Sequence, residues 1–354
     1  MSKIDELAKQ RAEWLTGGGP MSEVVISSRI RLARNVAGFP FLSKCDESQR
    51  REIEQMLRSK TEQLDIGQQM FYVDIERADE LDRRVLVERH LISRQHAEGE
   101  GSRGVTISQG ETLALMVNEE DHLRTQVLRS GLQLTDAWEQ MNQVDDLLEG
   151  VLDYAFHSRF GYLTACPTNV GTGIRVSVMM HLPALKLTGR LEHVFQAARD
   201  MKLAVRGLYG EGTEAVGDFY QVSNQTTLGK NEEQIVTEFE RIIPTIIEYE
   251  QNARQALLKE KLSVLDDKVW RAYGMLENAR RVSSEETMFL LSHLRMGVNL
   301  GRIDKLNIGT VNDLLLTIQP GHLQKLFSQR LDDDRRDEVR AEYIRRRLAE
   351  PSEN

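Results

Sequence analysis

The sequence has no apolar run approaching the ~18 residues that a membrane-spanning helix needs, and its first six residues are polar where a signal peptide would be apolar. Cysteine is scarce. Cys45 and Cys166 are too few for a disulfide framework, so each is either a small buried side chain or a reactive thiol, and we interpret Cys45 as structural. A formal net charge of -9 argues against generic nucleic-acid binding. The sequence therefore predicts a soluble, cytoplasmic protein with no membrane partner and no direct nucleic-acid partner.

Several familiar ligand motifs are also missing. No GxxxxGK[ST] occurs, which excludes a P-loop ATPase at the level of motif. Residues 99–104 match GxGxxG, but they precede a predicted strand and do not open a helix, so a mobile loop explains them better than a dinucleotide site. No HExxH or paired CxxC exists, and we therefore predict no metal site built from protein ligands.

Arginine is abundant. Of the 46 basic residues, 34 are arginine. Its planar, permanently charged guanidinium suits bidentate binding of phosphate and carboxylate groups, although composition bias alone can produce such an excess. The useful question is whether particular arginines lie where chemistry requires them.

Alternating polarity predicts that several arginines share strand faces. Over 24–33, Arg29 and Arg31 lie opposite Ile30. Arg175 lies on the polar side of a predicted strand at 174–181, and Arg206 on that of another at 203–208. Further predicted strands are 70–75, 112–117, 162–165 and 219–223, and predicted helices are 2–15, 46–64, 78–92, 133–156, 191–201, 232–262, 268–281, 285–297 and 334–348.

The strand signals stop near residue 230, and the remaining pattern is helical. A chain of 354 residues allows about two domains of ~150 residues each. We expect a mixed domain over 1–252 and an all-helical domain over 253–354. The predicted fold class is α+β, with a largely antiparallel sheet flanked by helices.

The most informative segment is CPTNVGTGIR, from Cys166 to Arg175, which sets a thiol, a glycine-rich turn and an arginine between two predicted strands. It resembles the signature CPTNLGTGxR of the phosphagen (guanidino) kinase family, with Val170 in place of leucine. Three more blocks resemble that family in the same order, namely SSRIRLARN at 27–35, NEEDHLR at 118–124 and RGLYGEGTE at 206–214. The resemblance covers roughly residues 20–250.

This resemblance implies phosphorylation of a guanidino group by ATP, with Mg²⁺ bound mainly through phosphate oxygens and water. It implies that Glu120 and Glu211 hold and deprotonate the guanidinium, with Glu120 as the base, and that Cys166 contacts it as a thiolate. His90 resembles the family histidine near the adenine. The implied ATP-binding positions are Ser27, Ser28, Arg29, Ile30, Arg31, His90, Arg124, Arg175, Val176, Ser177, Val178, Met179, Arg206, Gly207, Leu208, Tyr209 and Gly210, of which the five arginines would hold the phosphates.

The chain departs from the metabolite-phosphorylating members of the family, which carry a helical domain before the first arginine block. Here that block begins at Ser27, and a helical domain follows the catalytic part instead. This layout resembles the bacterial protein-arginine kinases of the McsB type. Their RDxxRA pocket for phosphoarginine matches Arg336, Asp337 and Arg340, although so charged a run is also typical of a solvated helix face.

The resemblance therefore implies a protein-arginine kinase that marks client proteins for degradation. The implied partners are a second copy of the chain, a McsA-type activator, the CtsR repressor and the ClpC-ClpP protease. Two alternatives remain open: a compact guanidino kinase that acts on free arginine, and an adaptor that reads phosphoarginine with little kinase activity.

Overall fold

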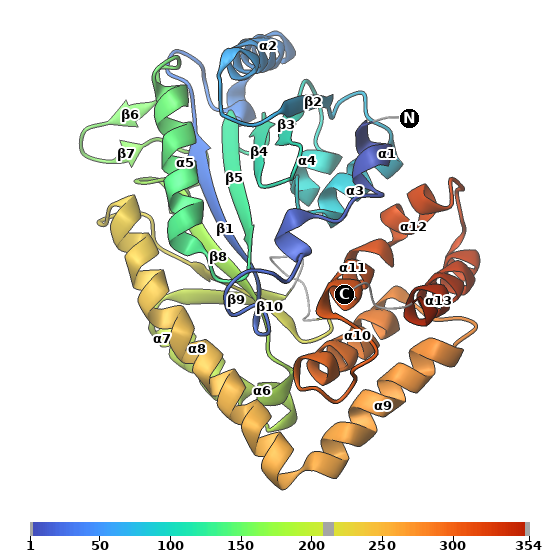
Figure 1. Ribbon diagram of the computed structural model, residues 1–354. Coiled ribbons are helices and arrows are strands. Elements are labelled where there is room, and N and C mark those ends of the chain that lie inside the picture. Colours follow the sequence, from blue (N-terminus) through green and yellow to red (C-terminus); the bar gives the residue numbers. More distant parts are fainter. Residues whose placement is uncertain (1–2, 208–215, 351–354) are drawn as a thin grey trace.

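The computed structural model describes residues 3–207 and 216–350, which fold around an eight-stranded sheet (Figure 1). The strand order is β2-β3-β4-β5-β1-β8-β10-β9, and each neighbouring pair is antiparallel. The strands are β1 Val25–Arg34, β2 Met70–Asp74, β3 Gly104–Ser108, β4 Leu113–Val117, β5 Leu123–Ser130, β8 Ile174–His181, β9 Leu203–Gly207 and β10 Phe219–Asn224. A separate hairpin joins β6 (Phe156–His157) to β7 (Gly161–Tyr162). The predicted α+β class with an antiparallel sheet is confirmed.

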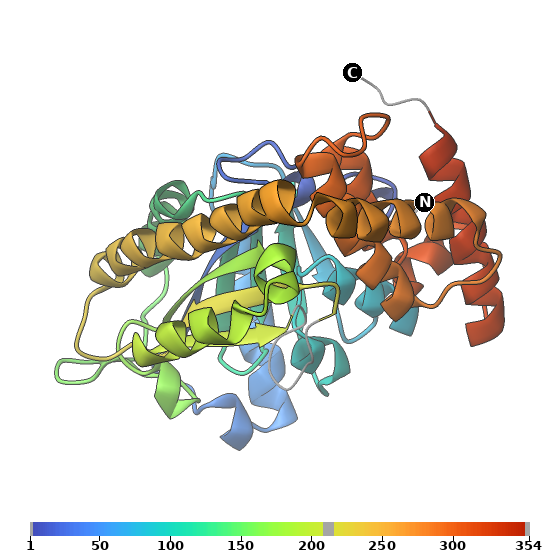
Figure 2. The same ribbon diagram turned by 90° about the horizontal axis from the view of Figure 1, so that it is seen from below.

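Helices cover the two sheet faces unequally. One face is covered over most of its width, and there α5 (Leu134–Glu149) packs on β1 and β5 while α8 (Glu232–Glu260) packs on β8 (Figures 1 and 2). On the other face, apolar side chains of β3 and β4 form a smaller cluster with α1, α3 and α4. The other helices of this part are α1 Lys3–Leu7, η1 Glu13–Leu15, η2 Leu42–Lys44, α2 Glu47–Gln63, α3 Glu80–Glu88, α4 Arg94–Glu98, η3 Pro167–Asn169, α6 Pro183–Leu187 and α7 Leu191–Asp200.

The C-terminal part is all-helical over the residues that the structure describes. Its helices are α9 Leu262–Asn278, α10 Ser284–Asn299, α11 Ile308–Thr317, α12 Pro320–Leu326 and α13 Asp333–Ala349. They pack on α3 and η1, and α8 connects them to the sheet (Figure 1). Residue 252 lies inside α8, and the proposed 1–252 and 253–354 domains stay a prediction. Among the described helices, none combines the length and the apolar character needed to cross a membrane.

Several element boundaries differ from those expected. The helix predicted over 2–15 is two short pieces, and the one predicted over 133–156 ends at Glu149, before Gly150. The helix predicted over 78–92 ends at Glu88, and His90 adopts a left-handed conformation (φ 58°). The amide of Leu91 bonds back to the carbonyl of Leu86, as in a Schellman motif. The sequence analysis did not identify β5, α4, α11 or α12, and it gave no bounds for β3.

Candidate active site

Strand register places five arginines on one face of the sheet. Directly opposed residues of antiparallel strands point to the same side. Arg31 opposes Arg175 across β1 and β8, and Arg29 lies two residues before Arg31. Arg124 of β5 opposes Ala33, which lies two residues after Arg31 on β1. Arg206 of β9 opposes Gln221 of β10, which lies on the same face of the sheet. Four strands thus direct guanidinium groups to the less covered face.

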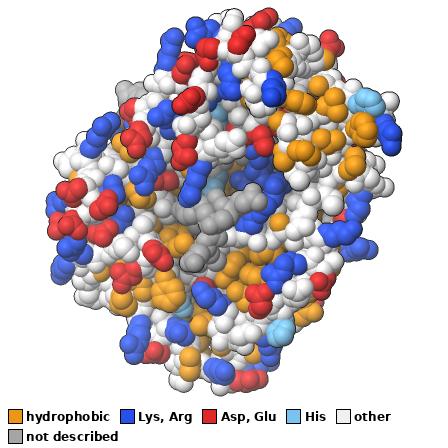
Figure 3. Space-filling view, turned by 180° about the vertical axis from the view of Figure 1, so that it is seen from behind, with side chains coloured by type: hydrophobic (Ala, Val, Ile, Leu, Met, Phe, Trp, Pro, Cys, Tyr) orange, Lys and Arg blue, Asp and Glu red, His pale blue; other side chains and the backbone are white. Residues whose placement is uncertain are grey.

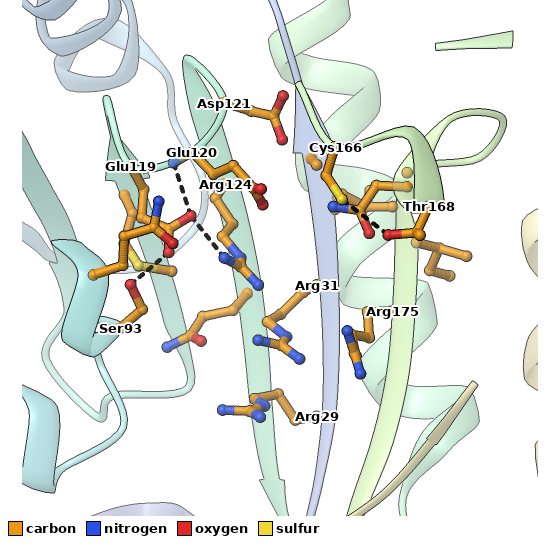
Figure 4. A pocket seen from close by; sticks show the side chains of 18 of the residues that line it. Arg29, Arg31, Ser93, Glu119, Glu120, Asp121, Arg124, Cys166, Thr168 and Arg175 are labelled. Carbon is orange, nitrogen blue, oxygen red and sulfur yellow. Dashed lines mark hydrogen bonds and ion pairs between the residues drawn. The ribbon is translucent and has the colours of Figure 1, made fainter. Parts of the chain in front are cut away.

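This arginine face forms the floor of a cavity of about 780 Å³. The loop that leads into β8, the segment that follows β10, the turn before β5, and the segment from α3 to α4 supply its walls. The lining residues used below are Arg29, Arg31, His90, Ser93, Arg94, Gln95, Glu119, Glu120, Asp121, Arg124, Gln126, Cys166, Thr168, Asn169, Arg175, Arg206, Gln221, Asn224 and Thr227. Figure 3 shows basic side chains gathered in this hollow, and Figure 4 shows how the labelled ones lie.

The arginines of the floor repel one another. Burial, followed by the charges of Arg124 and Arg175, lowers the pKa of Arg29 to about 9. Burial and the same neighbours, together with Arg29, hold the pKa of Arg31 well below its ordinary value. The buried Nε of Arg31 has no hydrogen-bond partner among the described residues. Such a cluster is suited to a polyanion, which would supply both the missing acceptors and the missing negative charge.

A buried carboxylate holds one of these arginines in place. Glu119 Oε2 lies 2.6 Å from Arg124 Nη1 and accepts the Glu120 amide at 2.9 Å, while Oε1 accepts the Ser93 hydroxyl at 2.5 Å (Figure 4). Burial raises the pKa of Glu119, but Arg124 and these hydrogen bonds outweigh it and bring the pKa to about 2. Both oxygens of Glu119 are therefore engaged. Sequence reasoning missed Glu119 and Ser93, although Glu119 lies inside the NEEDHLR block.

Glu120 and Cys166 lie on opposite sides of β1, above the arginines in the view of Figure 4. Asp121 ties their two loops together. Its Oδ1 accepts Asn35 Nδ2 and the Ala165 amide, each at 2.6 Å, so the end of β1 and the residue before Cys166 are fixed to the Glu120 loop. Burial raises the pKa of Asp121. Asp121 therefore positions the loops that carry Glu120 and Cys166, a role that the sequence did not suggest.

The glycine-rich turn sets Cys166 close to the arginine strand. Gly171 and Gly173 have φ of 114° and 65°, and a Cβ at these positions would lie 2.4 Å from the Thr227 carbonyl oxygen and 2.6 Å from the Ala33 carbonyl oxygen. Only glycine fits such close approaches without rearrangement. Cys166 Sγ lies 3.0 Å from Thr168 Oγ1 at the cavity wall.

His90 lines the end of the cavity next to α3. Its backbone carbonyl accepts Gln126 Nε2 at 2.7 Å, and its ring meets Trp14 edge-on at 5.2 Å. Burial, then the charges of Arg29 and Arg31, lower the pKa of His90 to about 3, so the ring is neutral at pH 7. A neutral aromatic ring at the rim of a cationic floor suits contact with a heterocyclic base.

The structure does not bring all predicted ATP-binding residues to the cavity. Ser28, Ile30, Val176 and Val178 point to the opposite face of the sheet, where they are fully buried. Ser27, Ser177 and Met179 are on the arginine face but do not line the cavity, and neither does Gly207. Leu208, Tyr209, Gly210 and Glu211 lie outside the described residues.

The predicted phosphoarginine residues lie on α13, on a part of the molecule separate from the cavity. Arg340 is only 2 % exposed, and it donates to the carbonyls of Ile318 and Val282 at 3.0 and 2.8 Å and to Asp337 at 2.5 Å. Arg336 is more accessible, with 19 % of its side chain exposed, and pairs with the exposed Asp333. Arg340 thus has a structural part that the sequence did not indicate.

Family comparisons agree with this geometry. Residues 52–253 match the model of the ATP:guanido phosphotransferase C-terminal catalytic domain, and residues 262–354 match that of the protein-arginine kinase McsB C-terminal domain. The chain is 45% identical over 349 residues to a protein-arginine kinase of Halothermothrix orenii, covering 98% of this chain and 99% of that protein. It is 46% identical over 346 residues to one of Symbiobacterium thermophilum, covering 97% and 98%.

Solved structures share the fold at lower identity. A lombricine kinase superposes with a TM-score of 0.58 at 28% identity, covering 68% of this chain and 70% of that one. A duplicated taurocyamine kinase from Schistosoma mansoni, with bound components of a transition-state analogue, gives a TM-score of 0.61 at 28% identity, covering 66% of this chain and 34% of that one.

Proposed function

The chain belongs to the protein-arginine kinases of the ATP:guanido phosphotransferase family, and from this premise we propose that it transfers the γ-phosphoryl group of ATP to arginine side chains of proteins. The observation that carries the proposal is the cavity itself. Its floor is an array of arginines directed by four strands, and its upper walls carry a carboxylate and a thiol. Phosphoryl transfer depends on positioning and electrostatic stabilisation, and this cavity offers both.

The arginine face binds the triphosphate. Among the described residues the Nε of Arg31 has no hydrogen-bond partner, and burial together with the neighbouring guanidinium charges lowers the pKa of Arg29 and of Arg31. Phosphate oxygens accept hydrogen bonds from these guanidinium groups and neutralise their positive charge. The same guanidinium groups stabilise the charge that spreads over the transferred group. Because the strands fix these side chains before the nucleotide arrives, little reorganisation is needed in the reaction.

The acceptor guanidinium lies between Glu120 and Cys166. Its pKa is above ~12, so it is a poor nucleophile until a carboxylate orients it and removes a proton as its nitrogen attacks. We assign the base to Glu120 because its position in the NEEDHLR block resembles that of the family base and because it lines the cavity. Cys166 binds the guanidinium from the other side, and Glu211 is proposed as the second carboxylate by resemblance alone.

Mg²⁺ fits this site as a companion of the nucleotide. Among the described residues no group of three or more His, Cys, Asp or Glu side chains could hold a metal ion. Glu119 is occupied by its own hydrogen bonds, which leaves Glu120 as a nearby carboxylate. When bound, the ion would neutralise part of the phosphate charge, and phosphate oxygens and water would supply most of its ligands.

The surrounding biology is proposed from family membership. The phosphorylated arginine marks client proteins for degradation by a ClpC-ClpP protease in the cytoplasm, a McsA-type activator assists, and the CtsR repressor is a substrate. The helical part forms a homodimer contact and binds phosphoarginine at Arg336, Asp337 and Arg340.

The proposal is tested by incubating the protein with Mg-ATP and a folded arginine-rich protein. Phosphorylated sites are then mapped at neutral pH, where the acid-labile N–P bond survives. We expect phosphoarginine with the wild type, none above background with Glu120→Ala, and full activity with Glu139→Ala, an exposed carboxylate of α5 that serves as control.

Two outcomes would favour the alternatives. If free arginine were phosphorylated as fast as protein arginine, the chain would be a metabolite guanidino kinase. If the wild type transferred no phosphate even with an activator, an adaptor that reads phosphoarginine would be the better interpretation. Cys166→Ala should reduce turnover while the fold persists, since one small side chain changes at the cavity wall.

A further inference from the structure

An aromatic hairpin projects from the body of the protein next to the glycine-rich turn at Gly171 (Figure 1). It consists of β6 and β7, in which Phe156 pairs with Tyr162. Phe156 is 60 % exposed and Phe160, in the turn, 43 % exposed. The two rings are held in place by neighbouring rings, Phe156 by Tyr162 at 5.3 Å and Phe160 by the stacked His157 at 4.9 Å. The hairpin therefore displays two large apolar side chains to solvent in fixed positions.

The hairpin is anchored to the body of the protein. A two-stranded ribbon this short is not stable by itself in water. The guanidinium of Arg34 lies 3.6 Å from the centroid of the Tyr162 ring, and Arg34 is itself paired with the buried Asp145 of α5 at 2.6 Å. This contact fixes the base of the hairpin to β1, the strand that carries Arg29 and Arg31.

A third exposed apolar side chain lies close by. Tyr162 and Gly171 exchange backbone hydrogen bonds of 2.8 and 3.3 Å, and a Cβ at Gly171 would lie 3.1 Å from the Cα of Leu228. Leu228 is 60 % exposed. We call the surface formed by Phe156, Phe160 and Leu228 the hairpin patch.

The hairpin patch is continuous with the cavity wall. Thr227, next to Leu228, lines the cavity, and its hydroxyl donates to the carbonyls of Thr168 and Val170 at 2.9 and 2.8 Å. Thr168 in turn contacts Cys166. The apolar surface therefore borders the side of the cavity where Cys166 lies.

We propose that the hairpin patch binds the apolar side chains that flank the acceptor arginine in a substrate polypeptide. This inference rests on the proposed function. When the guanidinium of the acceptor arginine reaches Cys166 and Glu120, the backbone of that arginine lies at the rim of the cavity. An extended chain rises ~3.3 Å per residue, so the residues two to four positions from the arginine also lie at the rim. A free guanidino compound has no such neighbours and would leave the patch uncovered.

The apolar character of the hairpin patch predicts which residues are preferred near the acceptor arginine. The patch presents two phenyl rings and a leucine, which gain free energy by covering apolar or aromatic surface. Fixed, clustered aromatic side chains are typical of binding hot spots. The preferred substrate is therefore an extended segment with Leu, Phe or Met within four residues of the arginine.

The test compares two twelve-residue peptides, each with one arginine, flanked in one by Leu and Phe and in the other by Ser and Thr. For the wild type with Mg-ATP, we expect kcat/KM at least tenfold higher for the apolar peptide. The variant Phe156→Ser/Phe160→Ser should reduce this ratio to within twofold, with the polar peptide and the KM for ATP unchanged. The control Trp270→Ser/Phe289→Ser removes side chains of similar exposure, 49 % and 48 %, from α9 and α10 and should keep the wild-type ratio.

Each other outcome overturns the inference in a distinguishable way. Equal kcat/KM of the wild type for both peptides would reject the patch while the proposed function stands. Transfer to neither peptide would reject both together. If the hairpin variant lost activity on both peptides equally and changed its elution in size-exclusion chromatography, the patch would be a contact with a second copy and not a substrate site.

Discussion

Two arginines, the half-buried Arg29 in the cavity and the fully buried Arg295 between the sheet and the helical part, have the same lowered pKa of about 9 for different reasons. Burial is the largest cause in both. Arg295 is saturated with acceptors, donating to the carbonyls of Ser22 and Glu23 and to Asn312 Oδ1 at 2.5 to 3.0 Å. Arg29 makes one hydrogen bond among the described residues, from Nη2 to Gln221, and otherwise faces cations.

This contrast extends to groups of arginines. Four are at most 2 % exposed and hold segments together, namely Arg34, Arg89, Arg295 and Arg340. Each donates to backbone carbonyls or buried side-chain oxygens of the protein itself. The cavity arginines instead converge on one open space. The number of internal acceptors and the solvent exposure, and not the pKa, therefore separate the arginines that stabilise the fold from the arginines that line the cavity.

The largest effect is expected at Arg89, which pairs with the buried Glu111 through bonds of 2.5 to 2.9 Å between α3 and β4. Arg89→Ala leaves an uncompensated buried carboxylate, and such changes cost about 3–5 kcal/mol. Thermal melting should show a large loss of stability. Arg271→Ala, which breaks an exposed pair with Asp267, should change it by less than about 1 kcal/mol. Equal losses in the two variants would remove the basis of the comparison.

Arg31 should behave in the opposite way. Arg31→Ala removes a donor from the phosphate site, and the loss of one such donor reduces kcat about 10²- to 10³-fold, equivalent to about 2.7–4 kcal/mol. Its melting temperature should stay level or rise, since a cation leaves a mutually repelling cluster. Phosphotransfer assays test the expected loss of kcat, and melting curves of the same preparation test the expected melting temperature. A fall in melting temperature comparable to that of Arg89→Ala would place Arg31 among the structural arginines.

A smaller effect is expected on α13, where the two classes of arginine occur one turn apart. Arg336→Ala should weaken phosphoarginine binding about ten- to a hundredfold, or about 1.5–3 kcal/mol, with little change in melting temperature. Arg340→Ala should reduce both the affinity for phosphoarginine and the melting temperature, because it removes the donor to the Ile318 and Val282 carbonyls. Calorimetry and melting of the full chain distinguish the variants. Unchanged phosphoarginine affinity in Arg336→Ala would show that this helix is only a charged surface.

The smallest effect concerns pH. The pKa of His90 falls from 6.5 to about 3 in the fold, so between these values the unfolded chain binds a proton that the folded chain does not. The contribution of the neutral His90 ring to the free energy of unfolding is fully present above pH 6.5 and is lost as the pH falls toward 3. Between pH 7.5 and 6 the loss of stability is less than about 1 kcal/mol, and His90→Gln should abolish this contribution in denaturant titrations at the two pH values. Identical pH dependence in wild type and variant would contradict the burial of a neutral ring.

Local pattern was enough to predict the arginine strand. The alternation over 24–33 placed Arg29 and Arg31 together, and β1 runs over Val25–Arg34 with that alternation. It was not enough for β5, which reads LRTQVLRS and has no clear alternation of apolar and polar residues because both of its faces are largely buried. His90 was assigned to a helix since helical periodicity continues to Ile92, whereas the helix ends four residues earlier, at Glu88, and His90 adopts a left-handed conformation.

The sequence by itself determined the family, the antiparallel α+β fold and the set of arginines and carboxylates available for phosphoryl transfer, because these depend on motifs and on a period of two along strands. Only the tertiary structure decided which groups are already engaged. It pairs Glu119 with Arg124, points Ile30 and Val176 away from the cavity, buries Arg340, and places an aromatic hairpin beside the glycine-rich turn. The physical reason is that hydrogen-bond saturation and solvent exposure depend on residues distant in the chain, which no local pattern records.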